Sequence, residues 1–533
     1  MDSTKIRVFF VVFLAACFAL YLGVAAATAQ TEAIAWMVGG LAVVFVLALG
    51  KHVWLLIPAG VSLNGGLNFL PGSPAPWWIA MMITGGIFFL RLATRRTGEF
   101  TWRWSILDLV IFIHIVVLAQ AYMRNPAGFS ILGGAGGTVG GKPYFTHGAA
   151  IVCYVLLSMV KTDIRMFRTA MIVMIACACF DGFTVLLGTF VPAIAAVGIQ
   201  FYSGFSFTAA NTGAGADVAE GRTTEGKNAG RSLGRAVLTI WRPLSVLNPF
   251  NFLPFSLFMV AMAAIAISGY RSAMGLLAVY FIVCSLIRRK VADVVVCSAI
   301  AVLGICMLLF IGTERLPNSF NRILSVIPIP GLVDEKIKQG AEKSTDWRVE
   351  MWMLALTTDR YIFNKWLGDG FGIRKDEMDA MIDSAYGDNR RAFGLDMQEV
   401  LMRRGSYHGF HVQTIRSSGY IGLFLALVVL GVFFRHAWKH IQFFRGRPEW
   451  GFVLYACVPF LIYPFYAMLV FGDYRFEFPR YIIAAGFLKM LWNIRAQEAL
   501  LPSATQPSAE DESGTVRRAG PGNRLPAPAM SRR

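Results

Sequence analysis

Two histidines, His408 and His411, precede a long apolar run late in the chain. The segment Tyr407-His408-Gly409-Phe410-His411 stands shortly before Gly419-Tyr420-Ile421-Gly422, where that run begins. Both imidazoles are therefore expected at a membrane boundary. A neutral imidazole near pH 7 is suited to take a proton from a hydroxyl group. A histidine at such a boundary can equally be structural, and the spacing leaves both roles open.

Arg348 and Trp352 lie upstream of the histidines, at a spacing that places both on one face of a helix. Asp346 is expected to N-cap this short helix. An arginine near a helix N-terminus can hold an anion together with the free backbone amides. The alternative is a surface arginine that packs on the tryptophan, and spacing alone favours that alternative.

A glycine-rich turn, Gly368-Asp369-Gly370-Phe371-Gly372, follows. Gly368, Gly370 and Gly372 can adopt positive φ angles or approach a ligand closely. The pattern is also common in simple turns. Arg404 and Arg416 flank the histidines and are reserve cations for an anionic group.

The elements that must position these residues are helices in a membrane. The 533 residues are 56% hydrophobic and 15% charged, with a mean hydropathy of +0.56, which excludes a soluble globular chain of this size. Repeated apolar runs of about 17 to 23 residues can each cross a hydrocarbon core of about 30 Å. A transmembrane β-barrel is excluded because no short segments alternate in polarity. The sequence predicts an all-α, polytopic helical bundle of about 12 to 14 spans.

The expected spans and their connections define four regions. The spans are 8–28, 33–50, 53–70, 77–94, 104–123, 147–161, 168–188, 189–205, 250–268, 272–287, 291–312, 417–435, 451–471 and 479–495. They divide the chain into an N-terminal transmembrane bundle (1–312), a large external loop (313–416), C-terminal transmembrane helices (417–495) and a disordered cytoplasmic tail (496–533). A loop of that length is rarely only a connector, so 313–416 is the expected catalytic region.

Lysines and arginines mark alternate connections, which are therefore expected in the cytoplasm together with both termini. They are Lys51, Arg91, Arg95, Arg96, Lys161, Arg165, Arg168, Arg288, Arg289, Lys290, Arg435, Lys439 and Arg445. The net charge of +17 is thus mainly a topology signal, with no nucleic-acid partner implied. The side occupied by 206–249 stays open, because 189–205 is either a span or an interfacial segment. That basic loop is either cytoplasmic or an external loop that handles an anion.

Further features concern the cysteines, the N-terminus and ionisable residues inside spans. The eight cysteines all fall in apolar runs, so neither a disulfide framework nor a zinc site is indicated. The first apolar run, ending near Ala27-Thr28-Ala29, is read as an uncleaved helix, with a cleaved signal peptide as the alternative.

Arg271, between two apolar runs, is costly unless paired or hydrated, which favours a functional role. The same argument favours a functional role for Asp108, Asp181 and His114, which also lie inside apolar runs. The alternative is that these three side chains form structural contacts between helices.

The order of these motifs resembles the O-antigen polymerase and O-antigen ligase superfamily of bacterial envelope enzymes. The resemblance rests on Arg348-x-x-x-Trp352, the turn 368–372, His408 eleven residues before Gly419, and the Gly-x-x-Gly-Leu that opens the next span. Ser268-Gly269-Tyr270-Arg271-Ser272-Ala273 and Leu247-Asn248-Pro249-Phe250-Asn251 are similar to two further family junctions. Gly409 stands where the family usually has Asn, and Ser417 where it has Glu. The resemblance is strongest over about 240–435.

The resemblance implies a GT-C-like, metal-independent inverting glycosyltransferase without a cofactor in the bacterial inner membrane. Its substrate would be an undecaprenyl-diphosphate-linked glycan at the periplasmic face, extended as O-antigen, capsule or exopolysaccharide. The lipid bilayer, and a flippase with a chain-length regulator, are the implied partners. His408 would be the base or orient the acceptor hydroxyl, and Arg271 and Arg348 would stabilise the diphosphate. Trp352, the turn glycines, Arg404, His411 and Arg416 would contact substrate.

Three other functions stay open. A ligase that moves finished glycan to a lipid or protein acceptor shares all these motifs. In a polysaccharide or solute transporter, Asp108, Asp181 and Arg271 would line a translocation path. No inverted repeat is evident in the sequence, and a large external loop with His and Arg beside the membrane is unusual for a transporter. A membrane scaffold would need no such series of motifs.

Overall fold

The computed structural model describes residues 48–95, 100–128, 138–205, 224–311, 335–374, 401–403 and 405–500, with a few single positions besides. Helices dominate these residues. The strands in this part of the chain are one antiparallel pair, β1 (Thr138–Val139) with β2 (Ile373–Arg374). The predicted span 8–28, most of 33–50, Arg404 and the tail beyond residue 500 lie outside the described residues.

Five helices are long and apolar enough to cross a membrane, which confirms the helical membrane class at this level. They are α4 (Pro76–Ala93), α5 (Ile106–Arg124), α7 (Ile164–Phe190), α19 (Phe410–Phe443) and α20 (Trp450–Leu469). Shorter or more polar helices complete the described chain. They are η1 (Gly50–Leu55), α3 (Leu56–Ser62), α6 (Lys142–Met159), α8 (Pro192–Phe201), η4 (Ser203–Phe205), α10 (Thr224–Ile240), α11 (Pro243–Val246), α12 (Phe252–Ser268), α13 (Arg271–Ile287), α14 (Val291–Ile311), α16 (Glu335–Thr357) and α21 (Glu477–Glu498).

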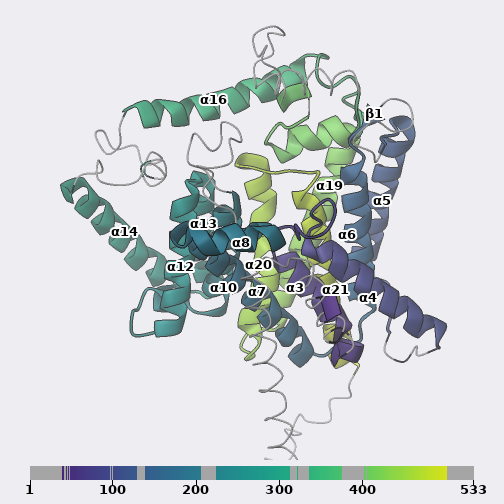
Figure 1. The fold of residues 1–533 in the computed structure, drawn as a ribbon, viewed down its shortest axis with the longest axis horizontal. Helices are drawn as coiled ribbons and strands as arrows, with labels where there is room; N and C mark the ends of the chain where they lie inside the picture. Colours follow the sequence, from purple (N-terminus) through teal and green to yellow (C-terminus); the bar gives the residue numbers. More distant parts are fainter. Residues whose placement is uncertain are drawn as a thin grey trace, which may run out of the picture.

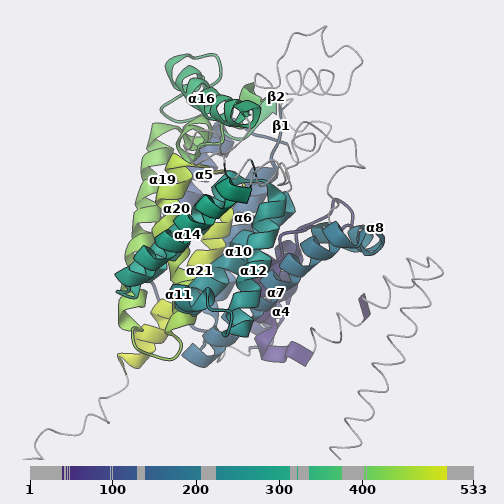
Figure 2. The ribbon, with the colours of Figure 1, turned by 90° about the vertical axis from the view of Figure 1, so that its left-hand side faces the viewer.

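The long helices run side by side, and α16 lies across one end of them (Figures 1 and 2). Helix α21 packs between α6 and α19, and α19 lies against α5 and α20. Helix α14 lies on the outside of the bundle, next to α13. The main core of buried side chains is therefore shared by helices from both halves of the sequence.

Most of the basic connections gather at one end of the bundle, called here the basic end. Arg288 donates to the carbonyl oxygen of Thr239 at 2.6 Å, and Arg445 donates to that of Ile287 at 2.6 Å. Arg447 pairs with Glu498 at 2.8 Å. The opposite end, called here the His408 end, carries α16 and the starts of α10, α13, α19 and α21. This segregation is the pattern that the predicted topology requires.

Two predicted spans are wrong in length. The span expected at 53–70 is η1 and α3, and its helix ends at Ser62 before a turn. The span expected at 189–205 is the ten-residue helix α8 followed by a single 3-10 turn. Ten helical residues rise only about 15 Å, half of a hydrocarbon core. Pro192 ends α7 here, because proline lacks the amide hydrogen that would continue the helix.

The described part of the segment expected as a basic loop, residues 224–249, consists mainly of a helix packed inside the bundle. Residues 224–240 form α10, which packs against α12, α7, α13 and α20. Gly230 and Gly234 allow this contact: a Cβ atom at Gly230 would lie 2.6 Å from Cγ1 of Ile265, and one at Gly234 would overlap Leu277. Small residues at this spacing let helices approach closely inside a membrane.

The ionisable residues inside the predicted spans pair across helices. Asp108 accepts hydrogen bonds from Lys489 at 2.5 Å and from Tyr154 at 2.8 Å. Asp181 accepts from the side chain of Asn64 at 2.7 Å. The rings of His114 and His147 are joined by a hydrogen bond of 3.0 Å. The structural alternative therefore accounts for Asp108 and His114.

Candidate functional site

His408 lies in a short loop immediately before α19. Its φ angle is +52°, a left-handed conformation that is uncommon for a residue with a side chain. The half-buried imidazole lies between two aromatic rings, with centroids 6.3 Å from Trp347 and 5.6 Å from Phe471. Strained backbone held by its surroundings is a feature of functional loops.

Helix α16 holds this loop from outside the bundle. Trp352 donates from its indole Nε1 to the carbonyl oxygen of Tyr407 at 2.7 Å, and its ring meets His411 edge to face at 4.7 Å. Gly409 leaves room for that indole, because a Cβ atom there would lie 2.9 Å from it. Trp352 and His411 thus belong to the support of the His408 loop.

Asp346 and Arg348 both lie well inside α16. The predicted N-cap at Asp346 is wrong, because the helix already begins at Glu335. Arg348 is half-buried on this helix, one residue after Trp347. Its guanidinium is therefore not at a helix N-terminus, and the macrodipole argument for an anion there does not apply.

Tyr407 is fully buried beneath the loop. Burial raises the pKa of its hydroxyl above the usual range, so the phenol is neutral at physiological pH. It packs in a small apolar cluster with Met351, Ala355 and Val412, which joins α16 to the start of α19. The loop that carries His408 is therefore anchored by the buried side chain of Tyr407.

The glycine turn is packed against three helices. Gly368 has φ +73° and Gly370 φ +76°. A Cβ atom at Gly368 would overlap the backbone of Ser418, and one at Gly370 would lie 2.7 Å from the hydroxyl of Tyr144. Arg124 of α5 donates to the carbonyl oxygens of Leu367 and Gly368. These contacts supply a packing reason for the two glycines, and their contact with a saccharide stays a prediction.

Arg416 is committed to the same turn. Its guanidinium donates to the carbonyl oxygens of Gly370 at 3.1 Å and Gly372 at 3.5 Å, and lies 3.6 Å from the carboxylate of Asp369. The carboxylate in turn accepts two backbone amides, those of Phe363 and Asn364, at 2.9 Å each. Arg416 thus holds the glycine turn against α19, and only 13% of its side chain is exposed.

Arg271 is the first residue of α13, at the His408 end. The preceding residue, Tyr270, lies under the ammonium group of Lys227, 4.5 Å from the ring centroid. Lys227 also lies 5.5 Å from the ring of Phe471, which contacts His408. Helices α10, α13 and the loop before α19 therefore meet around Phe471.

From Lys227 a line of cations descends along α10 into the bundle. Arg231 and Arg235 follow at intervals of four residues, and each interval advances the helix by about 6 Å. Arg231 lies over the ring of Tyr466 at 5.2 Å, and Arg235 donates to the hydroxyl of Tyr455 at 2.9 Å. The cations thus occupy one face of α10, beside the face on which Gly230 contacts α12 and Gly234 contacts α13.

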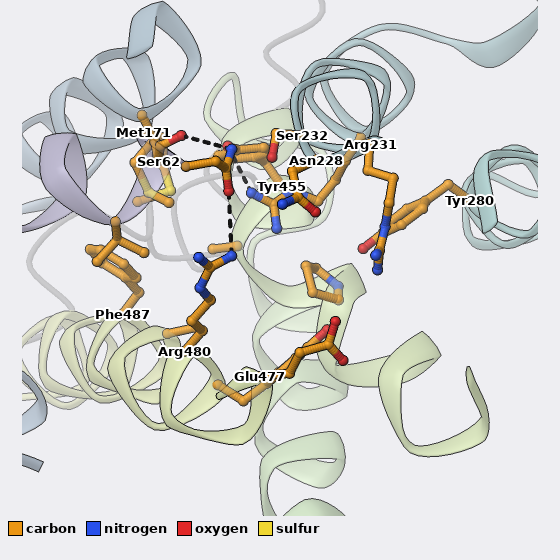
Figure 3. Close-up of a pocket in the computed structure, with 18 of the residues that line it drawn as sticks. Ser62, Met171, Asn228, Arg231, Ser232, Tyr280, Tyr455, Glu477, Arg480 and Phe487 are labelled. Atoms are coloured by element: carbon orange, nitrogen blue, oxygen red, sulfur yellow. Dashed lines mark hydrogen bonds between the residues drawn. The ribbon is translucent and has the colours of Figure 1, made fainter. Parts of the chain in front are cut away.

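This face opens into a cavity of about 170 Å³ between α3, α7, α10, α13, α20 and α21. Arg231 from α10 and Glu477 and Arg480 from α21 point toward the same space (Figure 3). Arg480 donates to the side-chain oxygen of Asn64 at 3.3 Å, and Asn64 is held by Asp181. Three guanidinium groups and one carboxylate therefore line a single cavity.

The cations that line this cavity outnumber its carboxylate by three to one. Among the described residues, Glu477 forms no ion pair with Arg231, Arg235 or Arg480. Its Oε2 atom and the Nε atom of Arg235 are buried without a hydrogen-bond partner. Buried polar atoms are normally satisfied. The guanidinium nitrogen of Arg235 can donate to water or to an anionic ligand, whereas the carboxylate oxygen of Glu477 can accept only from a donor such as water. An excess of cations favours the anion.

No protein-family model matches the chain. No curated protein matches it either. The interpretation of the site therefore rests on the residues and their geometry.

Sequence reasoning placed the cavity cations in a loop of uncertain side and did not select them as site residues. A signal was present: Gly226, Gly230 and Gly234 recur every four residues, directly before Lys227, Arg231 and Arg235. Glycines at this spacing indicate close helix packing, and the cations one position later share an adjacent face. Glu477 and Arg480 carry no comparable pattern in the sequence.

Proposed function

We propose that the protein is an inner-membrane glycan polymerase that joins oligosaccharide repeat units carried on undecaprenyl diphosphate. The observation that carries the proposal is the cationic cavity lined by Arg231 and Arg235 of α10 and by Arg480 of α21. Lys227, on the same face of α10 as Arg231 and Arg235, lies beside the His408 loop. A lipid-borne diphosphate needs cations within the membrane and a sugar acceptor site at its surface. The face of α10 that bears Lys227, Arg231 and Arg235 would supply the cations, and the His408 loop would supply the acceptor site.

The diphosphate is the group that the cavity suits best. Guanidinium groups bind phosphate oxygens through paired hydrogen bonds, and the apolar surroundings strengthen each of them. The cavity opens within a helical bundle that a prenyl chain can approach from the lipid. Lys227 and Arg271, nearer the His408 end, would hold the phosphate that carries the sugar.

In the proposed reaction His408 takes the proton of the acceptor hydroxyl. The acceptor oxygen then forms a bond to the anomeric carbon of the donor sugar from the face opposite the diphosphate, which inverts the configuration. The bond from that carbon to the phosphate oxygen breaks, and undecaprenyl diphosphate leaves with both electrons. The cations stabilise the negative charge that develops on the departing oxygen.

The proposed topology puts the basic end in the cytoplasm and the His408 end outside. The cations of the basic end support this orientation under the positive-inside rule. Helices α10, α12 and α13 then cross in alternating directions, and α16 lies along the outer surface. About 12 to 14 crossings and a GT-C-like arrangement belong to the proposal.

A ligase that transfers finished polymer is the second candidate, because the same diphosphate cavity serves either donor. Cells that lack the gene and carry either the wild type or His408→Ala separate the two, by gel profile of the envelope glycans. Loss of long chains, with a single repeat unit still reaching its acceptor, supports the polymerase. Loss of all attached glycan, with polymer accumulating on the lipid carrier, supports the ligase.

A transporter is the third candidate, since its path would also be a charged cavity. Purified protein in detergent decides this point. Incubated with lipid-diphosphate-linked repeat units, a polymerase lengthens the glycan without a membrane potential or a sealed compartment. Absence of product from folded protein, together with glycan trapped on the cytoplasmic side in cells, would replace the enzyme with a transporter.

A further inference from the structure

A second cavity, of about 390 Å³, lies at the basic end. Its walls come from η1, α4, the turn between α6 and α7, and the end of α21. A two-residue bridge between Phe100 and Val160 and a 2.9 Å hydrogen bond from the amide of Thr101 to the carbonyl of Met159 fix one wall. The volume falls within the range of small-molecule sites in proteins.

The rim of this cavity is basic. Lys51, Arg91 and Lys161 converge on it from three separate elements, and His52 lies beside them. The carboxylate on the rim, Asp163, is engaged as the N-cap of α7, where it accepts the amide of Met166 at 2.8 Å. Cations from η1, α4 and the α6–α7 turn thus line the same cavity. The carboxylate among the described lining residues is that of Asp163, which already caps α7.

The floor of the cavity is apolar. Trp54 and Phe88 are buried there, and the ring of Phe88 meets that of Phe100 edge to face at 4.9 Å. Phe89 and Leu92, sequence neighbours of Phe88 and Arg91, are exposed on the outside of α4. A ligand in the cavity therefore meets cations at the rim and hydrocarbon alongside.

We infer that this cavity binds the phosphate headgroup of an anionic phospholipid, with the acyl chains along the exposed face of α4. Basic pockets between transmembrane helices on the cytoplasmic side are suited to such headgroups. The apolar floor and the lipid-facing α4 favour a lipid over a soluble phosphate, which would gain nothing from either. The site is separate from the cavity of Arg231 and Glu477, and the inference uses the orientation proposed above but not the proposed enzymatic activity.

The test is native mass spectrometry of the full-length protein with added lipid. The wild type is expected to retain phosphatidylglycerol in preference to phosphatidylcholine. The double variant Lys51→Gln/Lys161→Gln is expected to weaken phosphatidylglycerol binding by about fivefold for each charge removed. The single variant Lys161→Gln, at an exposed position, should show about one fivefold step.

The matched control is Arg289→Gln/Lys290→Gln, which removes two exposed cations from the same end of the bundle but outside the cavity. It should retain wild-type binding. Equal weakening in the control and the cavity variant would overturn the site, because it would show a nonspecific charge effect. Displacement of the lipid by inorganic phosphate at the same concentration would overturn the lipid assignment.

Discussion

The indole of Trp352 donates a hydrogen bond of 2.7 Å to the carbonyl oxygen of Tyr407, the residue directly before His408. This bond joins α16, which lies across the end of the bundle, to the loop that carries the proposed base. Trp352 thereby fixes a backbone carbonyl of the His408 loop from the side of α16. The position of the His408 imidazole therefore depends on α16, a helix that does not line the cavity of Arg231.

Trp352→Phe keeps the ring against His411 and removes the hydrogen bond to Tyr407. A lost hydrogen bond of about 1 kcal/mol predicts a fall in kcat of about fivefold to tenfold, with KM little changed. Steady-state kinetics on lipid-linked repeat units measure both constants. Trp366→Phe is the control, because Trp366 is 70% exposed. An equal fall in the control would remove the positioning role.

His408→Asn tests the proposed base with little backbone strain, since asparagine tolerates a φ angle of +52° better than most residues. Loss of a general base predicts a rate lower by about 10²- to 10⁴-fold. The variant should accumulate in the membrane like the wild type. His436→Ala, toward the basic end of α19, should be mild. Unchanged polymer from His408→Asn would exclude the base.

Arg231→Gln and Glu477→Gln change the charge of the central cavity in opposite directions. Removing a charge-assisted hydrogen bond worth about 1.5 to 3 kcal/mol predicts weaker donor binding, by about tenfold to a hundredfold in Kd, for Arg231→Gln. Glu477→Gln removes a negative charge that repels the diphosphate, so it should tighten donor binding. Binding of a lipid diphosphate to purified protein measures both. Arg447→Gln, at the basic end, is the control, and a weaker Kd for Glu477→Gln would contradict the anion site.

Lys489→Met breaks a buried ion pair. The side chains of Lys489 and Asp108 are 0% and 3% exposed, so the variant leaves a carboxylate without its cation in the core. Such a loss costs about 3 to 5 kcal/mol of folding free energy. Lys489→Met/Asp108→Leu should recover much of it, because no charge then stays buried. Thermal unfolding in detergent compares the two, and equal stability of the single variant and wild type would show that the pair is not stabilising.

Gly419→Ala should prevent the glycine turn from docking. Gly419 has φ +74°, and a Cβ atom there would overlap the carbonyl of Trp366. Gly431→Ala is a matched control in the same helix, since its Cβ would meet nothing within 4 Å. Alanine favours a helix interior by about 0.5 to 1 kcal/mol over glycine, so the control should be neutral or more stable. Protease resistance of the two variants checks the difference.

The helices found from sequence are those whose evidence is local. An apolar run of sufficient length predicted α4, α5, α7 and α20 within a few residues, because lipid requires that composition of any spanning helix. The same signal located α19, but the predicted span 417–435 is shorter than the helix by seven residues at its start and eight at its end. Hydropathy left 189–205 open as a span or an interfacial segment, because it does not register the break at Pro192, and the ten residues of α8 are too few for the span. Helix α10 was taken for a loop because its cations face a cavity, and a hydropathy average cannot distinguish that from exposure to water.

His408, Trp352 and the glycine turn, which the sequence grouped by their order, do lie together around the start of α19, and their role in a site stays a prediction. The partners of those residues could not be foreseen, because Arg124 reaches Gly368 across 244 positions and Asn64 reaches Asp181 across 117. Such contacts follow from how the helices are arranged, and a single sequence carries no record of that arrangement. Glu477 and Arg480 were missed for the same reason.

The cations of α10 also constrain how the protein is made. Each Lys or Arg near the centre of an isolated helix costs about 2.5 to 3.5 kcal/mol when that helix enters a bilayer. Lys227, Arg231 and Arg235 together make α10 a poor candidate for insertion alone. The apolar helices α12 and α13 follow it in the chain, after the single turn of α11. Under the proposed topology, α10 is therefore expected to enter the bilayer together with α12 and α13, after all three have left the ribosome.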